Sequence, residues 1–255
     1  KDLRPTPEAL VKEAAAKARD DPDLDPLVRA QLLLTLGEIA RSSGDTANAE
    51  RLIDESIRRQ RALGVEPSSP GWIAALVSKG NLLHDTDRTA EADQLMLGLL
   101  PALEGVDTEG AVSALRLYSA TRAYAADTDR AVEFGTRALQ KAQRVFGVDS
   151  LNAVYTAMYV GLLANKLKHY VEGESILSDV VARWRRLGLP RNEVLARCLF
   201  HLAKARHKIG KAAGVETLYR EGIALMRSVG DESFYKISMG LRGLADFQID
   251  MEKFA

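Results

Sequence analysis

The 255-residue sequence has little cysteine, few aromatic residues and no net charge. Its one cysteine, Cys198, excludes an internal disulfide framework. Basic and acidic residues both number 35, so the general electrostatic argument for binding nucleic acid is absent. No apolar run is long enough to span a bilayer, and the amino terminus has no signal-peptide layout. We therefore expect neither nucleic-acid binding nor membrane insertion by this stretch of chain.

The reactive side chains form no catalytic or metal-binding pattern. Cys198 and His201 share a predicted helix face, but His207 turns away from them, and a structural zinc site normally needs four ligands. Adjacent carboxylates such as Asp54 and Glu55 do not face each other on a helix. No Ser/His/Asp or Cys/His set has supporting motif residues. The sequence predicts no enzyme activity, no metal and no cofactor.

A helix–turn–helix unit recurs along the chain. Its clearest copy is LLTLGEIARSSGDTANAERLIDESIRRQRALG, from Leu33 to Gly64. Large residues on one face of each helix fill the space between the pair, whereas Gly37 and Ala49 are small because two helix backbones cross there. The face residues are Leu33, Leu36, Gly37 and Ala40 in the first helix of the pair, and Ala49, Ile53 and Ser56 in the second.

These are the fixed positions of a tetratricopeptide repeat (TPR), and the segment resembles that family. A later segment, GKAAGVETLYREGIALMRSVG, aligns with GDTANAERLIDESIRRQRALG without a gap. The period is longer than that of a typical TPR and resembles the kinesin-light-chain type. The stretch DP-x-VRAQLLLTLGEIA-x3-G after an Ala-rich helix also resembles the TPR region that follows the kinase domain in certain bacterial serine/threonine protein kinases. The equivalent positions Ala49, Ala92, Ala131, Gly173 and Val215 are 43, 39, 42 and 42 residues apart.

The resemblance implies an all-α fold, a right-handed α-α superhelix (TPR solenoid) of about five and a half repeats with an N-terminal cap helix. We expect a single solenoid domain over residues 1–255, although Lys79 stands where a leucine is expected and should weaken the second repeat. Because the chain opens without methionine, we interpret it as a piece of a longer protein. The expected parts are a cap helix and linker at 1–25, repeats at about 26–64, 70–104, 109–147, 150–188 and 190–230, and a half repeat at 232–255.

In TPR proteins the first helices line a concave face, and ligands contact residues one or two positions from the packing ones. Transferring this rule position by position selects apolar and hydrogen-bonding side chains, a mixture that suits a peptide groove. The Lys/Asn clamp with which chaperone-binding members hold a C-terminal carboxylate does not appear. The candidates for peptide binding are Asn81, Tyr118, Tyr155, Met158, Asn165, Arg197, Phe200, Lys204, His207 and Arg242.

Charge is divided unevenly along the chain. Residues 1–130 carry 16 basic and 22 acidic side chains, and residues 131–255 carry 19 and 13. Ordinary solvated helix surfaces are one explanation of this imbalance. The other is a ligand preference, since Arg197, Lys204 and Arg242 surround Phe200 and Met239 and suit an acidic peptide with an apolar anchor.

We interpret the chain as a non-catalytic scaffold that binds a protein or peptide, the interaction or sensor region of a larger bacterial signalling protein. Its expected location is cytoplasmic, or periplasmic if a membrane span lies upstream. Two alternatives stay open: a ligand-sensing TPR domain of a transcriptional or peptide-pheromone regulator, and a self-association module. A homo-oligomer would form through the C-terminal half repeat, whose Leu241, Leu244, Phe247 and Ile249 lack a covering helix.

Overall fold

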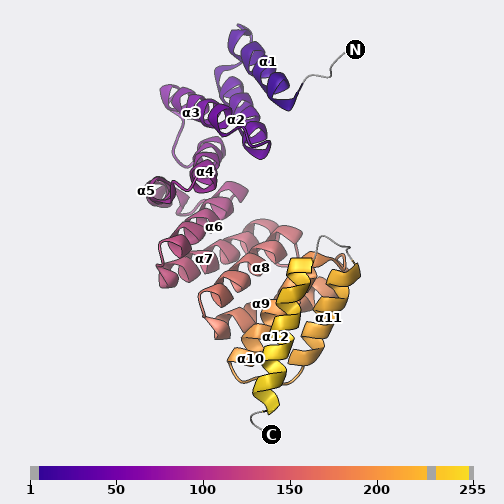
Figure 1. Cartoon of the computed structure of the whole chain (residues 1–255). Coiled ribbons are helices and arrows are strands. Elements are labelled where there is room, and N and C mark those ends of the chain that lie inside the picture. Colours follow the sequence, from indigo (N-terminus) through magenta and orange to yellow (C-terminus); the bar gives the residue numbers. More distant parts are fainter. Residues whose placement is uncertain (1–5, 229–233, 253–255) are drawn as a thin grey trace, which may run out of the picture. The chain divides into compact units, whose positions relative to one another are not determined.

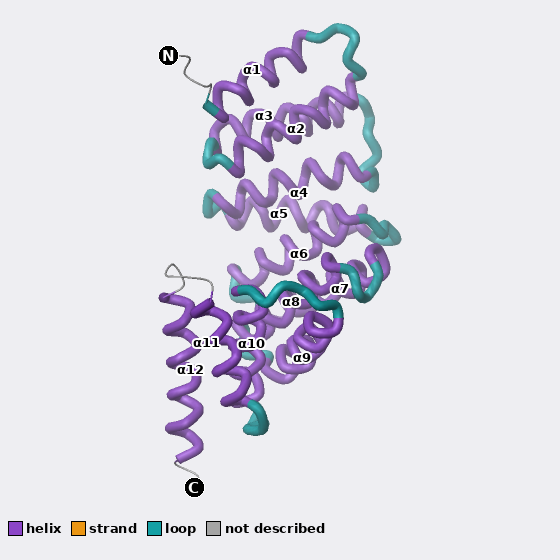
Figure 2. Tube along the Cα trace, turned by 90° about the vertical axis from the view of Figure 1, so that its right-hand side faces the viewer, coloured by secondary structure: helices purple, strands orange, loops and turns teal. Residues whose placement is uncertain are grey.

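A computed structural model describes residues 6–228 and 234–252 of the chain. Twelve α-helices follow one another in these residues, mostly as antiparallel pairs, and no strand occurs among them (Figures 1 and 2). The predicted all-α repeat fold is confirmed. No helix in the described ranges is long and apolar enough to cross a membrane. The chain divides into two compact units, 1–134 and 135–255, which are described separately.

The first unit consists of a cap helix, two helix pairs and the start of a third pair. α1 packs against α2, where Val11 and Ala15 are buried beside Leu33 and Leu36. α2 pairs with α3, α4 pairs with α5, and α6 packs on both members of the second pair (Figure 2). The elements are α1 (Pro7–Asp20), α2 (Pro26–Ser42), α3 (Thr46–Ala62), α4 (Pro70–Asp85), α5 (Thr89–Leu99), the 3₁₀ helix η1 (Leu100–Leu103) and α6 (Glu109–Tyr124).

Local sequence fixes where these helices begin and end. At the start of α2, the Asp25 carboxylate accepts hydrogen bonds from the backbone N–H groups of Leu27 and Val28, and Pro26 occupies the first turn. After α2 the chain turns at Gly44, whose φ of 83° is costly for residues with a Cβ atom. The short turn lets α3 run back along α2.

The two helices of a pair touch where a glycine leaves room for a large side chain. A methyl group built on Gly37 of α2 would lie 2.8 Å from Cγ1 of Ile53 in α3. In the second unit, the same group on Gly161 would lie 2.7 Å from Cγ of Leu177. These distances are shorter than van der Waals contact, so the backbones approach this closely only because both positions are glycine.

Lys79, which stands where a leucine was expected, forms ion pairs with two carboxylates of the preceding helix pair. Its ammonium group lies 2.7 Å from a carboxylate oxygen of Glu50 and 2.9 Å from one of Asp54, both on α3. The lysine side chain is largely covered, and its stem occupies the position where a leucine was expected. An ion-pair cluster therefore joins α4 to the preceding helix pair.

The second unit contains two complete helix pairs and a final single helix. α8 pairs with α9, α10 pairs with α11, and α12 lies along α11 and also contacts α10 (Figure 1). Trp184 is fully buried in its core, and the indole N–H donates a 3.0 Å hydrogen bond to the carbonyl of Pro190. The elements are the end of α7 (Thr128–Phe146), α8 (Leu151–Lys166), α9 (Tyr170–Arg186), α10 (Glu193–Lys208), α11 (Val215–Ser228) and α12 (Phe234–Glu252).

The face of α12 is covered more completely than the sequence indicated. Phe247 is buried and Leu244 packs against the core, because α12 docks through this face onto α10 and α11. Leu241 and Ile249 point the other way and remain exposed. The expectation of an uncovered stripe is thus wrong for two of its four residues and holds for the other two.

Within each unit, a side chain at the equivalent position in the last turn of one first helix contacts the next first helix. The four contacts are Arg41 to Asp85 (2.6 Å), His84 to Tyr124 (ring centroids 4.6 Å apart), Asn165 to the carbonyl of His201 (2.6 Å) and His207 to Asp250 (3.2 Å). The four contacts start from the same repeat position, but they differ in chemistry and in the position that they reach: Asp85, Tyr124 and Asp250 lie in the last turns of their helices, whereas His201 lies midway along α10.

The tight crossing predicts opposite effects of one substitution at two glycines. Gly98→Ala lies in α5 with no atom near the new methyl group, so it should raise the free energy of unfolding by up to about 1 kcal/mol. Gly37→Ala gains the same helix propensity but clashes with Ile53, and should be less stable than Gly98→Ala by about 1–3 kcal/mol. Urea unfolding of both variants measures the difference. Equal stabilisation would mean that α2 and α3 cross elsewhere.

Candidate functional site

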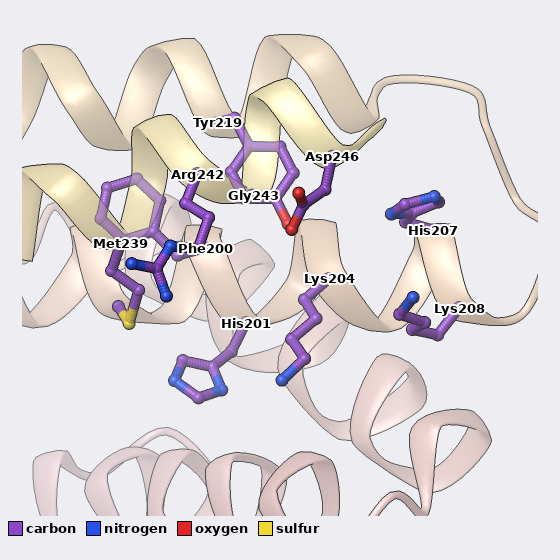
Figure 3. A pocket seen from close by; sticks show the side chains of 10 residues that line it. All are labelled: Phe200, His201, Lys204, His207, Lys208, Tyr219, Met239, Arg242, Gly243 and Asp246. Atoms are coloured by element: carbon purple, nitrogen blue, oxygen red, sulfur yellow. The ribbon is translucent and has the colours of Figure 1, made fainter. Parts of the chain in front are cut away.

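A cavity of about 190 Å³ opens between α10 and α12 in the second unit (Figure 3). α10 forms one side, α12 forms the other, and a ring from α11 lies between them. Apolar, aromatic and charged side chains all reach this cavity, which we call the α10–α12 groove. Its lining residues are Phe200, His201, Lys204, His207, Lys208, Tyr219, Met239, Arg242, Gly243 and Asp246.

Two glycines of α12 bring the aromatic floor of the groove together. A methyl group on Gly240 would lie 2.5 Å from the Phe200 ring, and one on Gly243 would lie 2.6 Å from the Tyr219 ring. The rings of Phe200 and Tyr219 are stacked, with centroids 6.3 Å apart and planes inclined by 29°. Because α12 has no side chain at these two points, both rings pack directly against its backbone.

The rim of the groove is mainly basic. Lys204, Lys208 and Arg242 are exposed, and Asp246 is the one carboxylate in the lining. Among the described residues, neither Lys204 nor Arg242 forms an ion pair, so both remain able to meet an anionic ligand. Burial, together with the nearby Asp246 carboxylate, raises the pKa of Tyr219 to about 12. Its phenol is neutral near pH 7 and adds no charge to the floor.

His201 adds a neutral polar group to the wall. Burial lowers the pKa of its imidazole to about 4, and the positive charges of Lys204 and Arg197 act in the same direction. The buried Nδ1 atom has no hydrogen-bond partner within the described residues. Asn165 holds the backbone of His201 by donating to its carbonyl at 2.6 Å. A buried nitrogen without a hydrogen-bond partner is costly to the fold.

The structure separates the ten sequence candidates into groups. Tyr118 and Asn165 are each 1% exposed, and neither lines the cavity, which corrects the expectation that they present open contacts. The ring of Tyr118 packs edge-on against Phe134, and Asn165 is turned toward His201. Phe200, Lys204, His207 and Arg242 line the α10–α12 groove, with Phe200 forming part of its floor.

The remaining candidates lie outside this cavity. Asn81 is half-buried in the first unit. Tyr155 is 38% exposed while its ring packs edge-on against Trp184, and Met158 is partly buried against the core. Arg197 is exposed on α10, N-terminal to the cavity.

Six lining residues are absent from the ten candidates: His201, Lys208, Tyr219, Met239, Gly243 and Asp246. Tyr219 belongs to a second helix, and the transfer rule considers only first helices. The spacing of Gly240 and Gly243 on one face of α12 is a sequence signal that could have found it, because small residues one turn apart indicate that a neighbouring side chain packs against the backbone.

Other candidate chemistry finds no geometry in the structure. Within residues 6–228 and 234–252, no group of three or more His, Cys, Asp and Glu side chains is placed to hold a metal ion. Cys198 is completely buried, and desolvation raises the pKa of its thiol to about 12. A thiol of this kind is a core residue rather than a nucleophile.

Comparisons with known proteins establish the fold. BtubC (BKLC) from P. vanneervenii is similar to this chain with a TM-score of 0.77 at 16% identity, over 89% of this chain and 93% of that one. A putative kinesin light chain from Podosopora anserina with TPR-like repeats has a TM-score of 0.67 at 13% identity, over 80% and 98%. The fold is a TPR solenoid. The predicted likeness to kinesin-light-chain repeats is thereby confirmed at the level of the fold.

A third TPR-type neighbour was solved with a ligand. A Rap protein complexed with Competence and Sporulation Factor has a TM-score of 0.60 at 11% identity, over 95% of this chain and 70% of that one. No protein-family model matches the sequence. No curated protein matches it either. At these identities the likeness extends to the TPR fold and not to the ligand.

The environment of His201 predicts a loss of stability in mild acid. The pKa of His201 is about 4 in the folded state and near 6.5 in the unfolded state. Its contribution to the free energy of unfolding is therefore fully present above pH 6.5. That contribution should be lost as the pH falls from 6.5 toward 4. His201→Gln should therefore reduce the difference between urea midpoints at pH 7 and pH 5. His169→Gln, in the turn before α9, is the control, and an equal reduction there would contradict the assignment.

Proposed function

We propose that this TPR chain recruits a protein partner by holding an extended acidic segment, with one apolar anchor residue, in the α10–α12 groove. The observation that carries the proposal is a floor of Phe200, Tyr219 and Met239 beneath a rim that bears three basic side chains and one carboxylate. Such a cavity combines a place for an apolar side chain with charges that select its neighbours.

The basic side chains form a row rather than a cluster. One face of α10 carries, at helical spacing, the basic Arg197, Lys204 and Lys208 and the neutral His201. The row is about 16 Å long, which corresponds to about five residues of extended peptide. Arg242 extends from α12 over the opposite side of the cavity (Figure 3). Several separate carboxylates on an extended segment match this arrangement better than one compact anion.

Each part of the ligand has a chemical counterpart. One leucine-sized anchor on the aromatic floor would contribute about 1.5–3 kcal/mol through burial. Exposed ion pairs with the rim would add less and weaken with salt. The imidazole of His201 is neutral near pH 7 and adds no charge to the wall. Recognition would therefore depend on the anchor for affinity and on the charges for orientation and selection.

In this proposal the chain is the interaction or sensor region of a larger, cytoplasmic bacterial signalling protein, as its resemblance to kinase-associated TPR regions suggests. The complex of a Rap protein with Competence and Sporulation Factor favours a second candidate, a ligand-sensing TPR domain of a regulator. Both candidates use the same groove and differ in the domain attached to it. The full-length sequence distinguishes them.

A matched set of labelled pentapeptides tests the groove. The probe has a central leucine and four acidic flanking residues, and fluorescence anisotropy reports its binding. Replacing the leucine by serine, or the acids by lysine, should weaken binding by about tenfold or more. Raising the salt concentration should weaken binding of the two peptides that keep the acidic residues and should not weaken binding of the lysine peptide. Equal binding of all three peptides, or of none, would contradict the proposal.

Charge reversal on the protein tests the same site. The double variant Lys204→Glu and Arg242→Glu should weaken binding of the acidic probe by about tenfold or more. Lys168→Glu with Arg227→Glu makes the same change in net charge at exposed residues outside the cavity, and should leave binding almost unchanged. Similar losses in the two variants would assign binding to bulk charge instead of the groove.

A further inference from the structure

The outward face of α12 carries an exposed stripe of residues spaced one turn apart. Leu241 is 45% exposed and Ile249 is 51% exposed, with exposed Ala245 between them. Gly240, Leu244 and Phe247 lie on the opposite side of the helix, which docks onto α10 and α11. The stripe is therefore separate from the contacts that hold α12 in the second unit.

Equivalent positions in the complete repeats are buried by a second helix. Counterparts of Leu241 include Leu33, Leu76, Ala157 and Leu199, each at most 9% exposed. At the counterparts of Ala245 two helices cross, since Gly37 meets Ile53 and Gly161 meets Leu177. α12 thus presents the same crossing surface, and no helix within the described residues covers it.

The stripe on α12 also has the residue pattern found on the second helices, which cover the first helices in the complete repeats. Covering helices place a small residue four positions before a large one, as in Ala49–Ile53 of α3 and Gly173–Leu177 of α9. In α12, Leu241–Ala245 repeats the order found on first helices, and Ala245–Ile249 repeats the order found on covering helices. One helix face carries both halves of the contact, so it is complementary to itself.

We propose that α12 pairs in antiparallel orientation with α12 of a second copy of this chain. Ile249 of each copy packs against Leu241 and Ala245 of the other, as Ile53 packs against Gly37 within the first repeat. A two-fold axis passes close to Ala245, and the contact closes on itself because the same patch serves both copies. The occupant of the stripe is another molecule of the same protein.

Charge supports the antiparallel orientation. Arg242 lies in the N-terminal half of α12, whereas Asp246, Asp250 and Glu252 all lie in the C-terminal half. An antiparallel pair places the acidic half of one helix beside the half of the other that carries Arg242, and also opposes the two helix dipoles. A parallel pair would bring the acidic halves together. Arg242 and Asp246 also line the α10–α12 groove, whereas Leu241, Ala245 and Ile249 do not. The apolar contact of the pairing is therefore independent of the proposed function.

Sedimentation equilibrium tests the pairing. The 255-residue chain should dimerise at about 100 μM, and Ala245→Arg should raise the dissociation constant about tenfold or more by placing two charges at the axis. Val171→Arg makes a comparable change at an exposed apolar residue of α9 and should leave the dimer intact. Circular dichroism checks that both variants keep their helices. A strictly monomeric chain, or a dimer that Ala245→Arg does not weaken, would overturn the proposal.

Cysteine cross-linking locates the axis. The native Cys198 thiol is buried, so an introduced cysteine is the accessible one. Ala245→Cys should form a disulfide-linked dimer under mild oxidation much faster than Val171→Cys, because the two copies of residue 245 meet at the axis. Equal rates for the two variants would place the contact elsewhere. A longer form of the protein that fails to cross-link at residue 245 would show that its own chain covers the stripe, and would also overturn the proposal.

Discussion

The structure depends on helices that touch at backbone distance. Where Gly37 or Gly161 leaves a space, Ile53 or Leu177 of the covering helix fills it, and the spacing of the pair follows. The same constraint builds the candidate site, since Gly240 and Gly243 let α12 rest on the rings of α10 and α11. Packing and binding therefore share one physical basis: a missing side chain on one helix determines which side chain of the next can approach it.

Contacts between neighbouring repeats follow a different logic. Near the ends of the first helices, an ion pair, an aromatic edge contact, an amide–carbonyl hydrogen bond and a histidine–carboxylate contact start from equivalent positions. The first residue of each contact stands at the same repeat position, whereas the residue that it meets differs from repeat to repeat in position and in chemistry. Sequence similarity between repeats is accordingly strong at packing positions and weak at these junctions.

This difference explains how much the sequence could predict. Helix pairs and small crossing residues were predictable, because packing imposes a size at fixed positions. Burial of Tyr118 and Asn165 was not, since each is held by a partner, Phe134 or the carbonyl of His201, that the repeat pattern does not specify. The ion pairs of Lys79 were not predictable for the same reason: its acidic partners come from the preceding repeat. The groove rule named four lining residues correctly but could not include Tyr219, which a second helix contributes.

The burial of Trp184 has a spectroscopic consequence. The chain has two tryptophans, Trp72 in the first compact unit and Trp184 in the second. The Trp184 indole is completely enclosed and hydrogen-bonded to Pro190, whereas Trp72 is partly exposed with the Arg61 guanidinium 5.9 Å from its ring. The two fluorophores should therefore emit at different wavelengths, Trp184 to the blue of Trp72. Each half of the repeat array carries its own intrinsic optical reporter, so loss of order in one half can be followed separately from the other.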